Sequence, residues 1–338
     1  MASNPLLKRL CGLAVFQNAQ VRAASSSCHK YIPRRALMYV PASDAKKLSK
    51  VTTLQADCVV LDCEDGVAVT RKQQARENCV KFFSEVEKPA SFRGELGVRV
   101  NSHQSGLLIE DVKALAEARR PPDAIMFPKV DDILCVEAFS MAFRQHLLTP
   151  FGDQMANKPL RLVIWIESAK ALLFMSTILS ATIALSQHLP VIVDGVVFGS
   201  DDFCADIGAT RTADARELMY ARQKFVTMCK AYKLQAIDIV YINYKDLDGL
   251  KQQCEEAVGW GFTGKQVIHP SQVPVVQKAF MPSAERIAWA RDLLTQFEQQ
   301  ASEGKGAITF RDQMIDMPLV LQARNVLQLV DAVGVTVE

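Results

Sequence analysis

Residues 163–168 read Val-Ile-Trp-Ile-Glu-Ser, and residues 196–203 read Val-Val-Phe-Gly-Ser-Asp-Asp-Phe. Each stretch is a short run of β-branched or aromatic residues that stops at an acidic side chain. Strands that are buried in a parallel sheet have this continuous apolar character. A residue just past the end of such a strand faces the site that the sheet builds. Since Mg²⁺ is usually held by one or two carboxylates with water and substrate oxygens, the two strand ends predict a metal-assisted enzyme.

The same strand-then-helix unit repeats along most of the chain. Amphipathic stretches typical of helices, such as residues 71–83, 107–118, 170–180 and 216–232, separate eight short apolar runs. Eight alternating units favour a (β/α)₈ barrel of the TIM type, an α/β fold, over an open doubly wound sheet. No Gly-x-Gly-x-x-Gly motif follows any run, which argues against a dinucleotide-binding fold. The predicted strands are residues 36–40, 58–61, 97–100, 124–127, 162–166, 195–198, 236–240 and 266–268.

The sequence divides into three predicted parts. Residues 1–30 hold basic residues, serines and an apolar helical face but no Asp or Glu, which is typical of a mitochondrial transit peptide. Residues 33–282 hold the predicted barrel. Residues 283–338 are predicted to form a C-terminal helical extension that carries Asp316 and acts as a lid over the site.

Composition excludes several classes of protein. The net charge of +2, without a basic stripe, argues against a nucleic-acid partner. No apolar run reaches the roughly 18 residues of a membrane-spanning helix, so we expect no membrane partner. The nine cysteines show no Cys-x-x-Cys spacing and are predicted to be reduced thiols in the core. Together with the N-terminus, they predict a protein of the mitochondrial matrix.

Polar residues recur at the carboxyl ends of the predicted strands, where a TIM barrel places its active site. Glu167 follows the fifth strand and Asp202 follows the sixth, and we expect these two carboxylates to hold the metal. The alternatives for both are helix caps or buried ion pairs. Asp201 is adjacent to Asp202 and would point elsewhere, so we expect it beside the metal ligands rather than on the cation.

Arg99 lies near the end of the third predicted strand. Its planar guanidinium suits two-point capture of a substrate carboxylate, which we favour over a structural ion pair with Glu64 or Asp65. Glu64 and Asp65 follow the second strand, and we expect them to orient Arg99 and ordered water rather than to bind the metal directly. Lys129, after the fourth strand, either neutralises these acids or contacts the substrate.

A second set of candidates lies near the first and eighth strands. Lys46 and Lys50 form either a solvated helical face or a place where phosphate groups bind, since ammonium groups act as point charges for phosphate. Tyr39, at the end of the first strand, offers a stacking or hydrogen-bonding surface. His269, before a proline at the end of the eighth strand, is either a packing residue or a ligand contact.

Six short motifs stand in order along the chain. They are Val-Leu-Asp-Cys-Glu-Asp-Gly-Val at 60–67, Val-Arg-Val-Asn-Ser at 98–102, Pro-Lys-Val at 128–130, Ile-Glu-Ser at 166–168, Phe-Gly-Ser-Asp-Asp-Phe at 198–203 and Lys-Gln-Val-Ile-His-Pro at 265–270. In combination they resemble the citrate lyase β-subunit-like family of acyl-CoA carbon–carbon lyases, from about residue 33 onward. The tail, with Met-Ile-Asp-Met-Pro at 314–318, narrows the resemblance to a mitochondrial member.

The resemblance implies Mg²⁺-dependent cleavage of citramalyl-CoA into acetyl-CoA and pyruvate, by an enzyme of a group whose members are usually trimers. It implies that Glu167 and Asp202 hold the metal and that Arg99 binds substrate. It also implies that Asp316 is the catalytic aspartate, which a neighbouring subunit delivers in some relatives; the alternative is that Asp316 caps the last helix. The residues that match the CoA substrate site are Tyr39, Lys46, Lys50, Ile268 and His269.

One departure and three rival functions remain. The family often has Glu-Asp where this chain has Asp201-Asp202, so the geometry is altered if the first residue contributes through a water. Some relatives run condensations that form malate or methylmalate, which makes a malate synthase-like enzyme one rival. A CoA-independent 2-keto-acid aldolase is the second, and a non-catalytic acyl-CoA-binding subunit is the third. The presence of Glu167, Asp202 and Asp316 argues against a non-catalytic protein.

Overall fold

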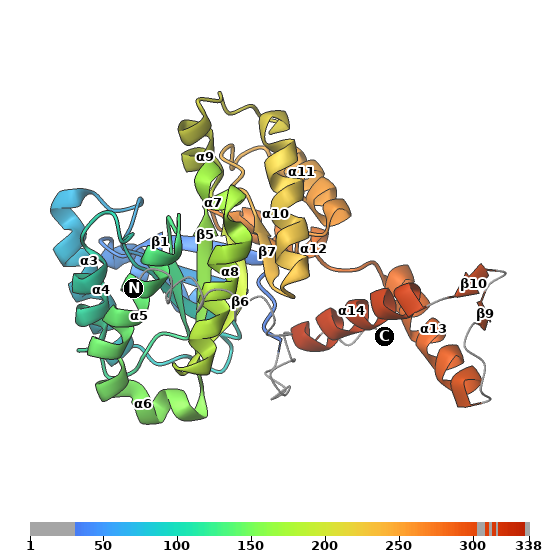
Figure 1. Cartoon of the computed structure of the whole chain (residues 1–338), viewed down its shortest axis with the longest axis horizontal. Helices are drawn as coiled ribbons and strands as arrows, with labels where there is room; N and C mark the ends of the chain where they lie inside the picture. The colour runs from blue at the N-terminus through green and yellow to red at the C-terminus, as the bar shows by residue number, and fades with distance from the viewer. Residues whose placement is uncertain (1–30, 303–307, 311–312, 316, 335–338) are drawn as a thin grey trace, which may run out of the picture.

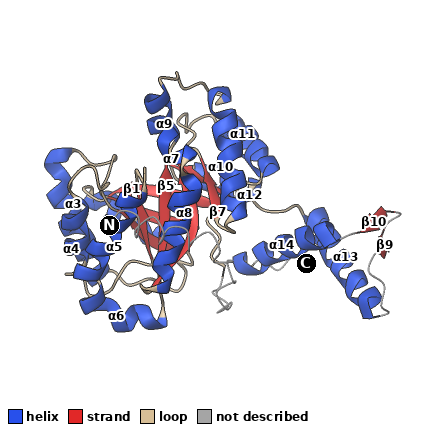
Figure 2. Ribbon diagram, viewed as in Figure 1, coloured by secondary structure: helices blue, strands red, loops and turns tan. Residues whose placement is uncertain are grey.

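Eight parallel strands close into a barrel, which confirms the predicted TIM-type fold. The computed structural model describes residues 31–302, 308–310, 313–315 and 317–334, so the predicted transit peptide at 1–30 lies outside the described residues. Each strand pairs with the next along the chain, and β1 closes the barrel against β8 (Figures 1 and 2). The strands are β1 (Ala36–Pro41), β2 (Cys58–Asp62), β3 (Glu95–Arg99), β4 (Ala124–Phe127), β5 (Leu160–Ile166), β6 (Val191–Phe198), β7 (Gln235–Asp238) and β8 (Gly264–Val267).

Helices cover the outside of the barrel (Figure 2). Residues 170–180, predicted as one helix, form the end of α7 and part of α8, because the backbone leaves helical geometry at Phe174 (φ −97°, ψ 14°). The barrel helices are α2 (Ala45–Leu48), α3 (Lys72–Glu85), α4 (Leu108–Leu115), α5 (Ile133–His146), α6 (Leu148–Asn157), α7 (Ala169–Leu173), α8 (Met175–Ala184), α9 (Ser200–Ile207), α10 (Met219–Ala231), α11 (Leu247–Trp260) and α12 (Gln272–Ala279).

The strands are buried on both faces, and this explains their continuous apolar sequences. On β5, Leu162 and Ile164 pack in the layer between the strands and the helices. Val163 and Trp165, which alternate with them, pack inside the barrel. Seven of the cysteines lie in the described residues as free, buried thiols, in line with their predicted role in the core.

Strand β6 begins at Val191, four residues before the predicted start at residue 195. The difference arises at Asp194, an acid within the strand that interrupts the apolar pattern. Its carboxylate accepts hydrogen bonds from Arg34 at 2.8 Å and from Arg161 at 2.6 Å. These ion pairs allow a charged side chain to lie within the strand, which periodicity alone does not reveal.

The C-terminal extension has a core of its own. It consists of α13 (Ala284–Ser302), the antiparallel strands β9 (Ile308–Phe310) and β10 (Gln313–Ile315), and α14 (Met317–Val333). Leu293 on α13 packs with Phe310 and with Val320 on α14. Figure 1 shows α13 and α14 projecting from the side of the barrel, with β9 and β10 at the far end. In the described part of the chain, no helix combines the length and the apolar character needed to span a bilayer.

Candidate active site

The ends of β2 and β3 bring an acid and a base together at the carboxyl end of the barrel. The strand register places Asp62 opposite Arg99. Arg99 donates from Nε and Nη2 to the two carboxylate oxygens of Asp62, both at 2.7 Å, and its Nη1 lies 3.1 Å from Glu64. Burial opposes the charge of Arg99, but Asp62 holds its pKa well above the ordinary value. The guanidinium is therefore charged and fixed, with its Nη1 edge toward Glu64.

Asp62 is a site residue that the sequence interpretation did not assign. A signal was available, since Asp62 directly follows the predicted strand at 58–61 and Arg99 lies near the end of the next predicted strand. The observed contacts include the ion pair between Arg99 and Glu64 that was considered as the structural alternative. Asp65 lies 3.8 Å from the same Nη1, so both acids are placed to orient the guanidinium. Capture of a substrate carboxylate by Arg99 stays a prediction.

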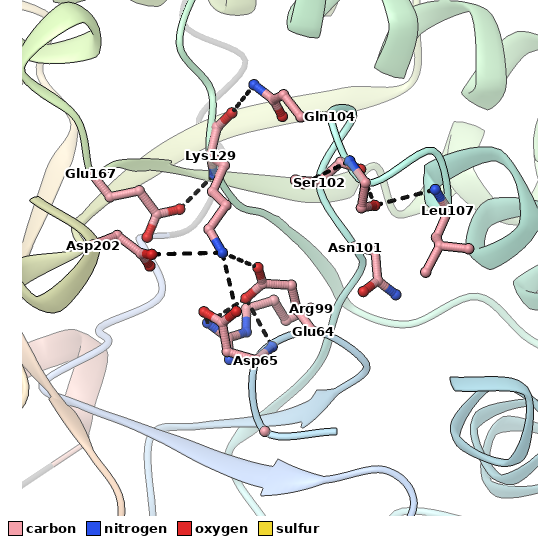
Figure 3. Close-up of polar contacts among 12 residues, drawn as sticks. Glu64, Asp65, Arg99, Asn101, Ser102, Gln104, Leu107, Lys129, Glu167 and Asp202 are labelled. Atoms are coloured by element: carbon pink, nitrogen blue, oxygen red, sulfur yellow. Dashed lines mark hydrogen bonds and ion pairs between the residues drawn. The ribbon is translucent and has the colours of Figure 1, made fainter. Parts of the chain in front are cut away.

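Glu167 directly follows β5, and Asp202 lies in the first turn of α9, which follows the adjacent strand β6. The two side chains lie near one another (Figure 3). Glu167 is buried, and its Oε1 accepts a 2.6 Å hydrogen bond from the backbone N–H of Lys129. Burial raises the pKa of Glu167 well above its ordinary value, and the charges of Asp202 and Glu64 raise it further. A Cβ at residue 199 would collide with the Glu167 side chain, so only glycine fits there.

This arrangement suits a hard divalent cation. Among the described residues, no three His, Cys, Asp or Glu side chains converge as a closed metal site. One buried and one partly exposed carboxylate match the way in which proteins bind Mg²⁺, with water and substrate oxygens as the further ligands. A cation between Glu167 and Asp202 would offset the repulsion that raises the pKa of Glu167. The residues present therefore fit Mg²⁺.

Lys129 connects the acids of this end of the barrel. Its Nζ lies 2.7 Å from Glu64, 3.1 Å from Asp65 and 3.7 Å from Asp202 (Figure 3). Of the two roles considered for Lys129, these are the contacts expected of neutralisation. Burial opposes its charge, but Glu64 and Asp65 raise the pKa of Lys129. Its backbone has a left-handed φ of 53°, which costs a non-glycine residue about 1–2 kcal/mol.

Asp201 points to a different partner from its neighbour. Its carboxylate accepts a 2.8 Å hydrogen bond from Nη1 of Arg211, while Nη2 of Arg211 donates to the carbonyl of Val240. Asp201 thus ties the first turn of α9 to two loops at this end of the barrel. The role of Asp201 beside the metal ligands stays a prediction.

Tyr39 links β1 to β8 on the inner wall of the barrel. Its hydroxyl donates to Oε1 of Gln266 at 2.6 Å, and Nε2 of Gln266 donates to the carbonyl of Phe198. Burial raises the pKa of Tyr39 well above its ordinary value, so the phenol is protonated. The Arg99 guanidinium lies 4.8 Å from the centre of the Tyr39 ring. The structure therefore brings Tyr39 together with Arg99.

The other predicted substrate residues lie outside the carboxylate cluster. Lys46 and Lys50 are exposed on and just after α2. Ile268 is 43% exposed after β8. The exposed ring of His269 stacks on Tyr244 with 4.6 Å between ring centres, and its Nδ1 lies 2.7 Å from Oγ of Ser271. Within the described structure, none of these four side chains contacts the carboxylates.

Asp316, the predicted catalytic residue, lies outside the described residues. The elements on either side of it, β10 and α14, are described. Both belong to the extension that projects from the side of the barrel (Figure 1). The assignment of Asp316 therefore stays a prediction.

Comparison with known proteins identifies the family. Residues 35–270 match the family model described as HpcH/HpaI aldolase/citrate lyase. Mitochondrial citramalyl-CoA lyase from Homo sapiens is 44% identical over 310 residues, which cover 92% of this chain and 89% of that protein. The crystal structure of CitE from Mycobacterium tuberculosis in complex with magnesium, acetoacetate and coenzyme A has a TM-score of 0.64 and 27% identity, covering 88% of this chain and 97% of that one.

A citrate lyase structure from Burkholderia xenovorans supports the same fold. It has a TM-score of 0.73 at 21% identity and covers 92% of this chain and 95% of that one. The family match and the resemblance indicated by the six motifs agree. The chain belongs to the HpcH/HpaI aldolase/citrate lyase family.

Proposed function

We propose that this protein is a Mg²⁺-dependent carbon–carbon lyase that cleaves citramalyl-CoA into acetyl-CoA and pyruvate. The observation that carries the proposal is the buried carboxylate of Glu167 beside that of Asp202, at the end of the barrel where this fold builds active sites. The human relative named citramalyl-CoA lyase supports the substrate. The magnesium and coenzyme A bound in the Mycobacterium tuberculosis CitE structure support the cofactor and the thioester class.

The chemistry divides between the cation and the side chains. When bound by Glu167 and Asp202, Mg²⁺ supplies Lewis-acid polarisation of the substrate oxygens. A base removes the proton of the tertiary hydroxyl, the carbon–carbon bond breaks, and the hydroxyl carbon becomes the ketone of pyruvate. The electron pair stays with the thioester fragment, which takes up a proton at carbon to give acetyl-CoA.

Arg99 is suited to hold a negatively charged substrate group. Asp62 locks its orientation through two hydrogen bonds, so little conformational entropy is lost when a further acceptor binds the guanidinium. A preorganised donor aimed at developing charge is typically worth about 10²–10³ in rate. Glu64 and Asp65 contact both Arg99 and Lys129. These acids therefore orient the guanidinium and the ammonium group toward the proposed substrate site.

The CoA portion is assigned to the rim of the barrel. Lys46 and Lys50 offer exposed ammonium groups for phosphate oxygens. Ile268 and His269, on the loop after β8, offer an apolar and a polar contact for the pantetheine and base portions. Tyr39 is assigned to the substrate site from β1, on the inner wall of the barrel beside Arg99.

The tail is assigned the proton transfers. We place Asp316 as the catalytic acid and base, and residues 283–338 as a lid that a neighbouring subunit of a homotrimer contributes. The support is the position of β10, which precedes Asp316 and lies at the far end of the extension, away from the barrel of its own chain (Figure 1). A second copy can bring such an extension to a site that its own chain leaves open.

Replacement of Asp316 tests this assignment. Asp316→Ala is expected to lower turnover by about 10²–10⁴-fold, the usual contribution of a general acid or base. Binding of Mg²⁺ and CoA should change less than about twofold, since their ligands lie on the barrel. Mixed oligomers of Asp316→Ala and Glu167→Gln subunits should regain activity if the tail acts on a neighbour. Near-normal turnover of Asp316→Ala alone would contradict the assignment.

The N-terminus is assigned to targeting. Residues 1–30 form a transit peptide in this proposal, and the mature enzyme works in the mitochondrial matrix. The absence of acidic residues from residues 1–30 and the name of the human relative support this location.

A product assay tests the function directly. Purified protein is given citramalyl-CoA, malyl-CoA, hydroxymethylglutaryl-CoA or free citramalate, each with and without Mg²⁺, and the products are identified. We expect acetyl-CoA and pyruvate from citramalyl-CoA at the highest kcat/KM, and only with the metal. Equal cleavage of the free hydroxy acid would favour the CoA-independent aldolase, and cleavage in the presence of a chelator would refute the metal mechanism.

A further inference from the structure

Lys129 lies between two pairs of carboxylates at the carboxyl end of the barrel. Its Nζ contacts Glu64 at 2.7 Å and Asp65 at 3.1 Å on one side, and Asp202 at 3.7 Å on the other. Figure 3 shows the ammonium group reaching from the loop after β4 to the middle of these acids. One ammonium nitrogen therefore separates the pair of Glu64 and Asp65 from the pair of Glu167 and Asp202.

The backbone of Lys129 is held at both ends. Its N–H donates to Oε1 of Glu167 at 2.6 Å, and its carbonyl accepts a 3.0 Å hydrogen bond from Nε2 of Gln104. The left-handed φ of 53° is the conformation in which the peptide makes these contacts. A strained backbone at a charged cluster points to a functional constraint. The peptide thus places Glu167 while the side chain of the same residue reaches the other acids.

The two pairs of carboxylates offer two alternative positions for a divalent cation. Nη1 of Arg99 forms an ion pair with Oε2 of Glu64. The ammonium group of Lys129 pairs with the other oxygen of Glu64, Oε1, and with Oδ1 of Asp65. Without the ammonium group these two oxygens would be available to Mg²⁺, which binds carboxylate oxygen preferentially. A cation drawn toward Glu64 and Asp65 would leave the position between Glu167 and Asp202.

We propose that Lys129 is a positioning residue that confines the catalytic cation to Glu167 and Asp202 by occupying Glu64 and Asp65 itself. The proposal rests on the function proposed above, since it requires the cation site at Glu167 and Asp202. Loss of the ammonium group should tighten metal binding, because a repelling charge is removed and two carboxylates are released, and should still slow the enzyme, because the cation is misplaced.

Metal binding without substrate is the direct test. Mg²⁺ is titrated calorimetrically into the full chain, as wild type and as Lys129→Met, and turnover of citramalyl-CoA is measured in parallel. We expect the Kd for Mg²⁺ to fall at least tenfold and kcat to fall at least a hundredfold. Lys129→Arg, which keeps the charge, should return the Mg²⁺ affinity to within about threefold of the wild type.

A double variant identifies the carboxylates responsible. Glu64→Gln in the Lys129→Met background removes a released carboxylate and should weaken Mg²⁺ binding back toward the wild-type value. Unchanged or weaker binding by a folded Lys129→Met, checked by its Tm, would overturn the inference, and so would an Arg variant that binds as tightly as the Met variant. If the wild type binds no Mg²⁺, the proposed function itself fails; if the wild type binds and Lys129→Met does not bind more tightly, only this inference fails.

Discussion

The two ends of the barrel both hold buried charges, and they differ in how those charges are balanced. At the amino end, the floor cluster consists of Arg34, Glu95, Arg161 and Asp194. Arg34 contacts Glu95 at 2.6 Å and Asp194 at 2.8 Å, and Arg161 contacts Asp194 at 2.6 Å. Two bases thus face two acids, and every acid of the cluster is paired with a base.

At the carboxyl end, acids outnumber bases. The mouth cluster consists of five carboxylates, from Asp62, Glu64, Asp65, Glu167 and Asp202, with two cations, from Arg99 and Lys129. The surplus of acids affects Glu167 most. Burial raises its pKa, and the charges of its acidic neighbours raise it further. One end of the barrel thus pairs all the acids of its cluster, whereas the other holds a surplus of acids. The surplus lies at the carboxyl end of the strands, where TIM barrels build their active sites.

Neutralising one carboxylate of the mouth cluster should lower activity strongly without unfolding the protein. Asp202→Asn is expected to lower kcat/KM for citramalyl-CoA by about 10³-fold, equivalent to about 4 kcal/mol, because one proposed metal ligand is lost. Excess Mg²⁺ should restore only part of the loss. The Tm should be unchanged or higher, since the substitution removes a surplus charge. Steady-state kinetics across a Mg²⁺ series and thermal unfolding provide the measurements, and a large fall in Tm would contradict the comparison.

Neutralising an acid of the floor cluster should have the opposite effect. Glu95→Gln removes a partner from fully buried Arg34, and breaking a buried ion pair costs about 3–5 kcal/mol of stability. Mg²⁺ affinity should not change, because the floor cluster lies at the other end of the strands. Denaturant unfolding measures the loss. Glu85→Gln, which removes the exposed ion pair with Lys81, is the matched control. This substitution should change the free energy of unfolding little.

The pH dependence of stability should separate the two ends further. The pKa of Glu167 is raised in the folded state, so its protonated form favours folding below the ordinary pKa of about 4.5, and this contribution is lost as pH rises through the raised pKa. In the absence of metal, the Tm of wild type should therefore fall with pH over that interval more than the Tm of Glu167→Gln. Added Mg²⁺ should raise the Tm of wild type more and more toward the upper end of this pH interval. If the curves of Tm against pH for wild type and Glu167→Gln run parallel in the absence of metal, the pKa of Glu167 is not raised by burial.

The barrel could be predicted because its strands are apolar on both faces and end at polar residues. The predicted and observed starts of β1, β2 and β4 coincide. The start of β6 was missed because Asp194 needs two arginines to be tolerated in a strand, and one of them, Arg34, is distant in sequence. Such a partnership depends on closure of the barrel and leaves no local pattern.

The candidate site could be predicted in part for the same reason. Strand ends identified Glu167 and Asp202, which the structure places near one another. The pairing of Arg99 with Asp62 depends on the register between β2 and β3, which one strand alone does not reveal. The contacts of Lys129 depend on a left-handed backbone conformation that its sequence neighbours, Pro128 and Val130, do not indicate.

The position of a bound cation can be located by anomalous diffraction. Crystals of the full chain are soaked in Mn²⁺ as an anomalous substitute for Mg²⁺, and the anomalous difference map is calculated. We expect one peak at coordination distance from Glu167 and Asp202 and none in the floor cluster. A peak on Glu64 and Asp65 alone, or no peak at the carboxyl end of the barrel, would contradict this expectation.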